Sequence, residues 1–361
     1  MTELTHSFEC NIPFDVVFDE EVEWVKLKET KSEDGQFKMV FELQPNTGEF
    51  FNRTKLRLEN EVLGLSFPLS LSQMYKTYDG HTVIWKKPTY NDPFASVPNF
   101  PRITFNFILI GDGFTKEEIE SGVYDLYCQE AMEGMESLEP FKTYSERFGF
   151  ILLHAESAES GCTDYNATYG GPKVVDTRFK CSYDEFGTGM NCDYTAIQEF
   201  VKTSIEGAGL DYIPTQDVVI VMANGKRYGG VANLTKSGEG VAICPVSEEP
   251  FPNNFVQILR HEAGGHAFGK LADEYSFGGP IDASTASYLK SWQEAGMYLN
   301  VSMSSTEFPK PWQELKDRGK ISDVYVGGFS CSGGVWRSSE NSLMKGMDEG
   351  FNILSRYLIY L

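Results

Sequence analysis

Three nearly uninterrupted runs of apolar residues constrain the fold of this chain more than any other feature. They are RITFNFILIG at 102–111, FGFILLHA at 148–155 and DVVIVMA at 217–223. A strand that is apolar on both faces is typical of a parallel sheet that helices cover on both sides. Helical patterns alternate with these runs, so the sequence predicts an α/β domain.

Two helices are predicted between the strands. The first begins at a capping box of Thr115 and Glu118 and continues to about residue 134. The second covers 194–206, with one apolar face that consists of Ile197, Phe200, Val201 and Ile205. Gly111-Asp112-Gly113 follows the first strand, but the GxGxxG and GKS/T patterns are absent. We therefore expect a strand-to-helix turn there rather than a phosphate-binding loop.

Residues 1–90 show a different pattern, in which short segments alternate apolar and polar residues. The segments are VEWVKLKE, QFKMVFELQ, TKLRLEN and LGLSFPLSLSQ, and turns with DG, NTG or single glycines separate them. This spacing predicts a small antiparallel β-sandwich. The segment 91–102 holds three prolines and predicts a linker. The sequence thus predicts an α+β multidomain chain with a second domain at 103–361.

Composition excludes several classes of protein. With 41% apolar and 14% aromatic residues, a disordered chain is excluded. Lys and Arg number 31 against 52 Asp and Glu, a formal net charge of −21. This charge argues against binding to nucleic acid and against docking on anionic lipid, because both need basic surfaces. No run of 18 apolar residues occurs, so we expect no membrane span.

The N-terminus and the cysteines leave questions open. MTELTHSFEC has neither a basic nor an apolar signal region, so either the protein is cytosolic or a signal segment is missing from this chain. None of the seven cysteines forms a CxxC pair, which argues against a cysteine-built zinc knuckle. Whether two of Cys162, Cys181 and Cys192 form a disulfide stays open.

The chemistry concentrates at residues 253–275, NNFVQILRHEAGGHAFGKLADEY. His261 and His266 lie here on either side of Glu262, and neutral imidazole is a common zinc ligand. Zinc peptidases typically carry HExxH on a helix, so that both histidines share one face. This chain has HExxxH, which is one residue longer.

The extra residue changes the helix geometry. In a regular α-helix an i+5 side chain points about 140° from the first, against about 40° for i+4. A π-bulge absorbs one extra residue and is frequent at functional sites. Gly264 and Gly265 lie inside the insertion and ease such a distortion. We therefore predict a bulged metal-binding helix with Asn253 or Asn254 as its N-cap.

The residues after the helix supply a third ligand. Gly269 lies where the chain must leave the helix sharply, which favours a residue that tolerates positive φ. Asp273 and Glu274 follow, and a carboxylate is a normal zinc ligand. Ala272 occupies the position where the longer HExxHxxGxxH pattern has a third histidine. Asp273 is the first choice for the ligand and Glu274 the second.

HEAGGHAFGKLADEY resembles the metal-binding segment of the IgA-peptidase family of secreted zinc metallopeptidases. The resemblance covers most of 103–361 and extends through LIGDGF (109–114), VVDTRF (174–179), VMANGKRYGGVAN (221–233) and RSSENSLM (337–344). The commoner form in that family has the shorter HExxH spacing. The resemblance implies a metzincin-like α/β catalytic domain in which a Met-turn, here at Met344, passes beneath the zinc.

A second resemblance concerns the N-terminal domain. The stretch NTGEFFNRTKLRLENEVLGLSFPLSLSQM resembles the BACON-type β-sandwich that often precedes secreted bacterial enzymes. Asn46, Arg53 and Gln73 match its pattern. A spacer domain without a ligand is the alternative interpretation.

The sequence suggests a mechanism. His261, His266 and Asp273 would hold one Zn²⁺, which lowers the pKa of bound water toward about 7. Glu262 would take the proton of that water and pass it to the leaving amine. The substrate would be a protein or glycoprotein.

Further residues are candidates for substrate contacts. An extended peptide needs an exposed strand edge, which DVVIVMANGKRYGG could supply. Asn224 and Tyr228 are candidate contacts, although each fits a turn role equally. Arg337 would stabilise charge or pair with an acid.

The leading hypothesis is therefore an endopeptidase that is secreted, periplasmic or on the cell surface. One alternative is a dipeptide-releasing exopeptidase, because HEAGGH resembles the dipeptidyl-peptidase III motif, whose third ligand is a distant glutamate. The nearby Asp273 speaks against it. Another alternative is a surface binding protein with a degenerate or structural metal site, which would not need Glu262. The plainest alternative is a helix with two hydrogen-bonded histidines and surface acids.

Overall fold

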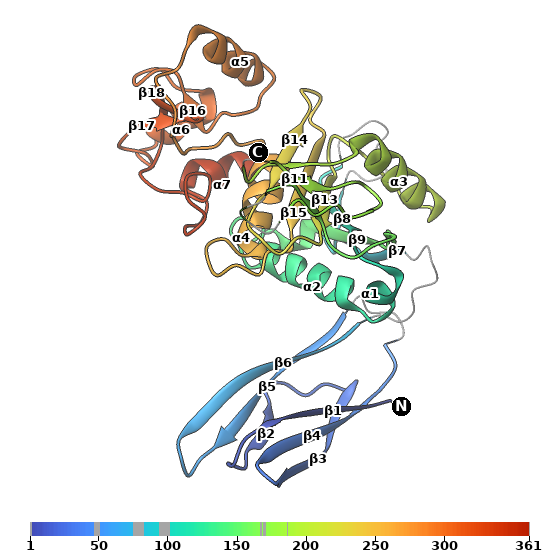
Figure 1. The fold of residues 1–361 in the computed structure, drawn as a ribbon. Helices are drawn as coiled ribbons and strands as arrows, with labels where there is room; N and C mark the ends of the chain where they lie inside the picture. Colours follow the sequence, from blue (N-terminus) through green and yellow to red (C-terminus); the bar gives the residue numbers. More distant parts are fainter. Residues whose placement is uncertain are drawn as a thin grey trace. The chain divides into compact units, whose positions relative to one another are not determined.

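The computed structural model describes residues 2–46, 51–74, 83–93, 102–166, 168, 171–185 and 187–360. The chain divides into two compact units, Met1–Thr77 and Tyr78–Leu361, and Figure 1 labels their elements. The sequence placed the first domain boundary at residue 90. In the structure β7 (Val83–Lys86) pairs with β9 (Phe148–Leu153) of the second unit. Most of the linker predicted at 91–102 lies outside the described residues.

The N-terminal unit consists of two three-stranded antiparallel sheets. One has the order β1 (Thr2–Glu9), β4 (Gln36–Leu43), β3 (Val25–Glu33), and the other β2 (Asp15–Phe18), β5 (Phe51–Asn60), β6 (Leu65–Met74). Alternate residues of β4 and β5, among them Phe37, Phe41, Leu56 and Leu58, are buried in one shared core. The four predicted strands are confirmed, whereas β1 and β2 were not predicted.

A six-stranded sheet forms the centre of the C-terminal unit. Its order is β14 (Val231–Leu234), β15 (Gly240–Pro245), β13 (Val218–Ala223), β8 (Phe105–Asp112), β9, β7. The four inner strands are parallel, and β14 and β7 are antiparallel to their neighbours. The three apolar runs of the sequence are the adjacent strands β13, β8 and β9, which are buried almost throughout. The predicted mixed α/β organisation is confirmed.

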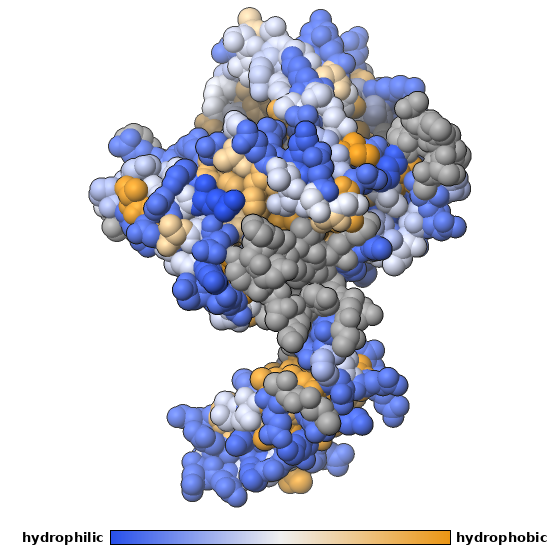
Figure 2. Space-filling view, turned by 90° about the vertical axis from the view of Figure 1, so that its right-hand side faces the viewer, coloured by the Kyte–Doolittle hydropathy of each residue, from blue (hydrophilic) through white to orange (hydrophobic). Residues whose placement is uncertain are grey.

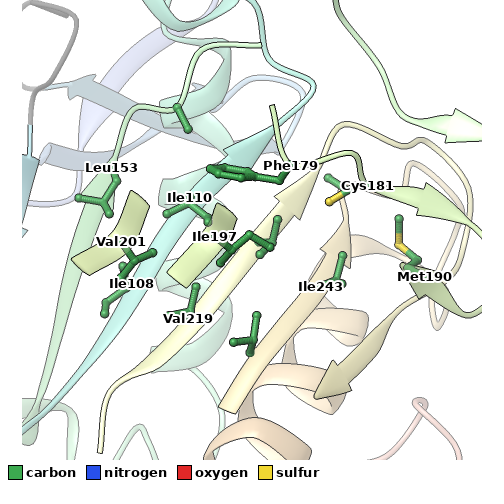
Figure 3. Close-up of a cluster of buried hydrophobic side chains, with 14 of the residues drawn as sticks. Ile108, Ile110, Leu153, Phe179, Cys181, Met190, Ile197, Val201, Val219 and Ile243 are labelled. Carbon is green, nitrogen blue, oxygen red and sulfur yellow. The ribbon is translucent and has the colours of Figure 1, made fainter. Parts of the chain in front are cut away.

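Helices cover both faces of this sheet (Figure 1). On one face, α3 (Tyr194–Gly207) buries Ile197, Val201 and Ile205 against the strands, in a cluster that Figure 3 shows. On the other face lies α2 (Val123–Glu136), whose Tyr124 hydroxyl donates to the Leu109 carbonyl at 3.0 Å. The predicted capping box is present and begins α1 (Lys116–Glu120). The single helix predicted to residue 134 is divided in two, because Gly122 adopts a left-handed conformation.

The remaining elements are short. Two small sheets belong to this group. One consists of β10 (Thr163–Asp164), β11 (Ser182–Tyr183) and β12 (Met190–Asn191), and the other of β16 (Val301–Ser302), β18 (Cys331–Arg337) and β17 (Tyr325–Gly328). The helices are the 3₁₀-helix η1 (Ser145–Arg147), α4 (Phe255–Leu259) with the π-helix η3 (Arg260–Phe268), α5 (Ala283–Glu294), α6 (Lys310–Asp317) and α7 (Ile353–Tyr360).

Among the described residues, none of the helices has the length and apolar character that crossing a bilayer requires. All seven cysteines are free thiols, so Cys162, Cys181 and Cys192 form no disulfide. Figure 2 shows hydrophilic residues over much of one face, which accords with the net charge of −21.

Asp112 joins three of the sequence motifs at the carboxyl end of β8. Its Oδ1 accepts from the Phe179 backbone N–H at 2.7 Å and its Oδ2 from that of Cys181 at 2.9 Å. The Asn224 amide donates to the Gly113 carbonyl at 2.9 Å. A Cβ on Gly113 would lie 1.8 Å from the Gly161 carbonyl oxygen, and its φ is +79°. The segment is therefore a tightly packed strand-to-helix turn, as predicted.

We predict that Asp112→Ala lowers the free energy of unfolding of the C-terminal unit by about 2–4 kcal/mol, because two buried backbone N–H groups lose their acceptor. Denaturant titration followed by circular dichroism measures the change. Asp211→Ala, at an exposed position, is the control and should change little. An equal stability of the two variants would contradict the role of Asp112.

Candidate metal centre

The helix that carries both histidines is a π-helix over Arg260–Phe268. It continues α4, whose N-cap is Asn254, with a side chain that accepts from the Gln257 N–H at 3.1 Å. The Gly269 N–H bonds to the Gly264 carbonyl at 3.0 Å, an i→i−5 bond. Because such bonds bring residues five apart to successive turns, the extra residue of HExxxH is absorbed. The predicted bulge is present and extends over nine residues.

His261, His266 and Asp273 converge, as the sequence predicted. The Nε2 atoms of the two histidines lie 3.1 and 3.2 Å from Oδ1 of Asp273. The imidazole rings are nearly perpendicular, with centroids 4.8 Å apart. One ligand atom from each of the three residues lies within 4.8 Å of the others. A single ion can therefore contact all three side chains, which we call the metal trio.

Backbone carbonyls orient the two imidazoles. His261 Nδ1 lies 3.0 Å from the Leu343 carbonyl oxygen, and His266 Nδ1 lies 2.7 Å from that of Leu271. A carbonyl accepts only from an N–H, so these contacts assign the proton of each neutral ring to Nδ1. Each Nε2 then turns a lone pair toward the Asp273 carboxylate. This arrangement of electron pairs needs a cation, and two nitrogens with one oxygen are a ligand set that zinc commonly has.

The pKa shifts of His266 and Asp273 also indicate that the trio holds a cation. Burial alone would lower the pKa of His266, but the Asp273 carboxylate raises that pKa to about 9. Burial alone would raise the pKa of Asp273, but His266 and His261 hold it well below its usual range. Without a metal the trio therefore retains protons, and metal binding must displace them.

Glu274, the second choice for the third ligand, has a different position. It is fully buried, and its carboxylate accepts from Asn300 Nδ2 at 2.9 Å, from Ser342 Oγ at 2.6 Å and from Asn352 Nδ2 at 3.2 Å. Its backbone N–H donates to the Met344 carbonyl at 2.7 Å. Glu274 thus fixes the segment 342–344 beneath the site, and the structure favours Asp273 as the ligand. Sequence reasoning missed this network, whose only sequence signal was the RSSENSLM motif.

Met344 lies directly against the π-helix. Its side chain is fully buried, and a Cβ built on Gly265 would come within 2.2 Å of its sulfur. A Cβ on Gly264 would contact Phe141 and Met135 at 3.2 and 3.3 Å. The two glycines therefore permit close packing on two sides of the helix, in addition to the backbone freedom that the sequence suggested.

The prediction of a positive φ at Gly269 is wrong by one residue. Gly269 has φ −73°, and the left-handed residue is Lys270 with φ +53°. A glycine is nevertheless required at 269, because a Cβ there would lie 2.8 Å from Ile359 Cγ1 and 2.9 Å from the Gly265 carbonyl oxygen. Packing against α7, rather than a left-handed turn, explains this residue.

Glu262 lies beside the trio in a tight environment. Burial raises its pKa, against the opposing effect of His261 and His266. A Cβ on Gly230, which precedes β14, would come within 2.9 Å of Glu262 Oε1. The chain leading into β14 therefore packs directly on this carboxylate.

Two tyrosines belong to the surroundings of the trio. Burial first, and then the charges of Glu262 and Asp273, raise the pKa of Tyr228, which places this candidate substrate contact near the trio. Burial and a hydrogen bond to Asp273 raise the pKa of Tyr275. Sequence reasoning missed Tyr275, although it is part of the DEY motif.

Other predicted substrate contacts are not brought to the trio. Asn224 bonds within the Asp112 turn, and Nη1 of the buried Arg337 donates to the carbonyls of Val326 and Gly327 at 2.6 and 3.0 Å, where it fixes β17 to β18. The segment 217–230 was expected to supply an exposed strand edge, but its strand β13 pairs on both sides, with β15 and β8. The outer strand is β14, to which the Gly-rich part of that segment leads.

A family model described as IgA Peptidase M64 matches residues 95–321, which is more than half of the chain. The chain belongs to the IgA peptidase M64 family. No curated protein matches it. Membership identifies the chain as a peptidase of a metallopeptidase family. The matched residues include the whole trio and Glu262 and end before Met344.

We predict that in this M64 peptidase Gly265→Ala destabilises the C-terminal unit by about 1–3 kcal/mol, because the new methyl group displaces Met344. Gly207→Ala at the end of α3, where a Cβ would meet nothing within 4 Å, should instead be neutral or stabilise by about 0.5–1 kcal/mol. Thermal unfolding of both variants measures these effects. A Gly265→Ala variant as stable as the wild type would refute the packing of Met344 on the helix.

Proposed function

We propose that the chain is a secreted zinc-dependent endopeptidase that hydrolyses peptide bonds in a protein or glycoprotein substrate. The observation that carries this proposal is the convergence of the trio beside Glu262, which is half-buried. Both imidazoles present Nε2 to one carboxylate oxygen at 3.1 and 3.2 Å. A helix with only hydrogen-bonded histidines would not need two like-oriented lone pairs at one carboxylate.

The trio fits a catalytic zinc better than a structural one. Three protein ligands leave one position open, whereas structural zinc sites have four protein ligands. Among the described residues, the only group of three or more metal-binding side chains is the trio itself. Zinc held there would supply Lewis acidity, which polarises a peptide carbonyl and acidifies water.

Glu262 is the group that moves the proton. It follows His261 directly, and burial raises its pKa, so its carboxylate accepts a proton more readily than an exposed one. It takes a proton from the attacking water and then transfers it to the amine that leaves. The lack of a side chain at Gly230 leaves room for Oε1, because a Cβ there would lie within 2.9 Å of that atom.

The edge of the sheet offers a place for the substrate backbone. β14 is the outer strand of the sheet, and the segment before it packs on Glu262. An extended peptide that pairs with β14 as an added strand would therefore run close to the trio. Tyr228, whose pKa is raised first by burial and then by the charges of Glu262 and Asp273, is the candidate side chain for contact with it.

The remaining parts of the proposal concern fold type and location. An antiparallel outer strand, the site helix and the buried Met344 beneath it support a metzincin-like catalytic domain. Contacts of Gln73 with Asn46 and Asn52 at 3.4 and 2.9 Å support a BACON-like β-sandwich, while the side chain of Arg53 lies outside the described part of the chain. Export to the periplasm, the cell surface or the medium rests on the family resemblance alone.

We predict that Glu262→Ala and Glu262→Gln keep the bound metal and lose peptidase turnover by about 10²–10⁴-fold, because the general base is removed. Elemental analysis measures the metal, and cleavage of an internally quenched peptide measures the rate. Glu294→Gln, at an exposed position of α5, is the matched control. Activity retained in both Glu262 variants would refute the role of this residue.

We also predict that peptides with acetylated N-termini are cleaved as well as free ones, because an endopeptidase does not recognise the terminus. Mass spectrometry of the products of a blocked and an unblocked peptide series tests this. Strict release of dipeptides from free N-termini would favour the exopeptidase alternative. A chain that binds zinc and cleaves neither series would favour the binding protein.

A further inference from the structure

A second candidate site lies at the carboxyl end of the π-helix. A cavity of about 440 Å³ has Phe268, Gly269 and Lys270 in its lining, but none of the trio. This volume is in the usual range for small-molecule sites. The cavity is also bounded by the beginnings of β8 and β13 and by α7.

The walls of the cavity are mostly apolar. Phe268 packs on Phe105 and Phe148 with ring centroids 5.3 and 5.4 Å apart. Leu299, Leu358 and Ile359 are half-buried around the same space. These side chains present apolar surface to the cavity, so an apolar ligand body would gain hydrophobic contact there.

Arg147 supplies a positive charge for which the described residues provide no counter-ion. Its guanidinium lies over the rings of Tyr90 and Tyr144, 4.8 and 5.5 Å from the ring centroids. Its Nε is buried and has no hydrogen-bond partner in the part of the chain that the structure describes. The two rings hold the guanidinium in place without neutralising it.

Lys270 supplies a second positive charge in the lining. Its ammonium donates to the Ala267 carbonyl, and burial lowers its pKa to about 8. Within the described part of the chain, neither Lys270 nor Arg147 forms an ion pair, although acids outnumber bases by 52 to 31. Two partly buried cations without a carboxylate are therefore unexpected in this chain, because buried charges are normally paired.

Gln216 adds an unused acceptor. Gln216 is in the cavity lining, and within the described residues its buried Oε1 has no hydrogen-bond partner. An N–H group on the ligand would satisfy it. The lining thus combines apolar walls, two cations and one acceptor.

We propose that this cavity binds a carboxylate carried on an apolar body, with Arg147 and Lys270 as the groups that recognise the anion. Two sources share this chemistry: a fatty acid, and the C-terminal hydrophobic residue of a peptide, whose amide N–H would also reach an acceptor such as Gln216. The site is independent of the proposed peptidase chemistry, and its test does not use catalysis.

Isothermal titration calorimetry on the full chain tests the proposal with four probes. Decanoate represents the fatty acid and N-acetyl-phenylalanine the peptide terminus, and decanol and N-acetyl-phenylalanine amide are their neutral counterparts. We expect at least one acid to bind and to exceed its neutral counterpart in affinity by about tenfold or more. The acid that binds identifies the source. Binding of neither acid, or equal binding of acid and neutral counterpart, would overturn the proposal.

Charge-neutralising variants locate the binding. Arg147→Gln and Lys270→Gln should each weaken binding of the acid by about tenfold. Lys202→Gln, at an exposed position of α3, is the control and should leave the affinity unchanged. Thermal unfolding shows whether each variant is folded, and if Lys270→Gln is not, Arg147→Gln decides alone. Full affinity in folded Arg147→Gln would overturn the assignment.

Discussion

The C-terminal unit is organised around an electrostatic requirement. Two imidazole nitrogens and one carboxylate oxygen lie close enough for lone pairs to face one another, with Nε2 to Oδ1 distances of 3.1 and 3.2 Å. Such a group is stable only if a cation, either protons or a metal ion, lies among the three. The surrounding contacts maintain this geometry. The carbonyls of Leu343 and Leu271 orient the rings, and Glu274 fixes the chain that supplies the first of them.

The π-helix follows from that requirement. Because the histidines are five positions apart, a regular α-helix would direct the rings apart, and the i→i−5 hydrogen bonds bring them together. π-Helices are rare, so this one needs support from its neighbours. Gly265 permits Met344 to pack against the helix, and Gly269 permits α7 to approach its end. The wider helical turn, the glycines and the buried methionine therefore form one packing arrangement.

The sequence predicted features that depend on neighbouring residues. Three of the four inner strands, the capping box at Thr115, the cap at Asn254 and the convergence of the trio all follow from local patterns, whereas β15 was not predicted. Features set by distant partners were missed or misplaced. The network of Glu274 spans 26 to 78 residues along the chain, and strand order decides that β14, not β13, is at the edge. No local pattern shows that a glycine at 269 serves packing against Ile359.

The most direct test of this account is the metal content per chain, measured by elemental analysis on wild type and on His266→Ala. The account predicts one zinc per wild-type chain and its loss in the variant, because His266 can ligate only if the π-helix turns it toward His261. His6→Ala, in a strand of the N-terminal unit, should retain the zinc. A wild-type chain that takes up no zinc when it is supplied, or a His266→Ala variant that keeps it, would contradict the account.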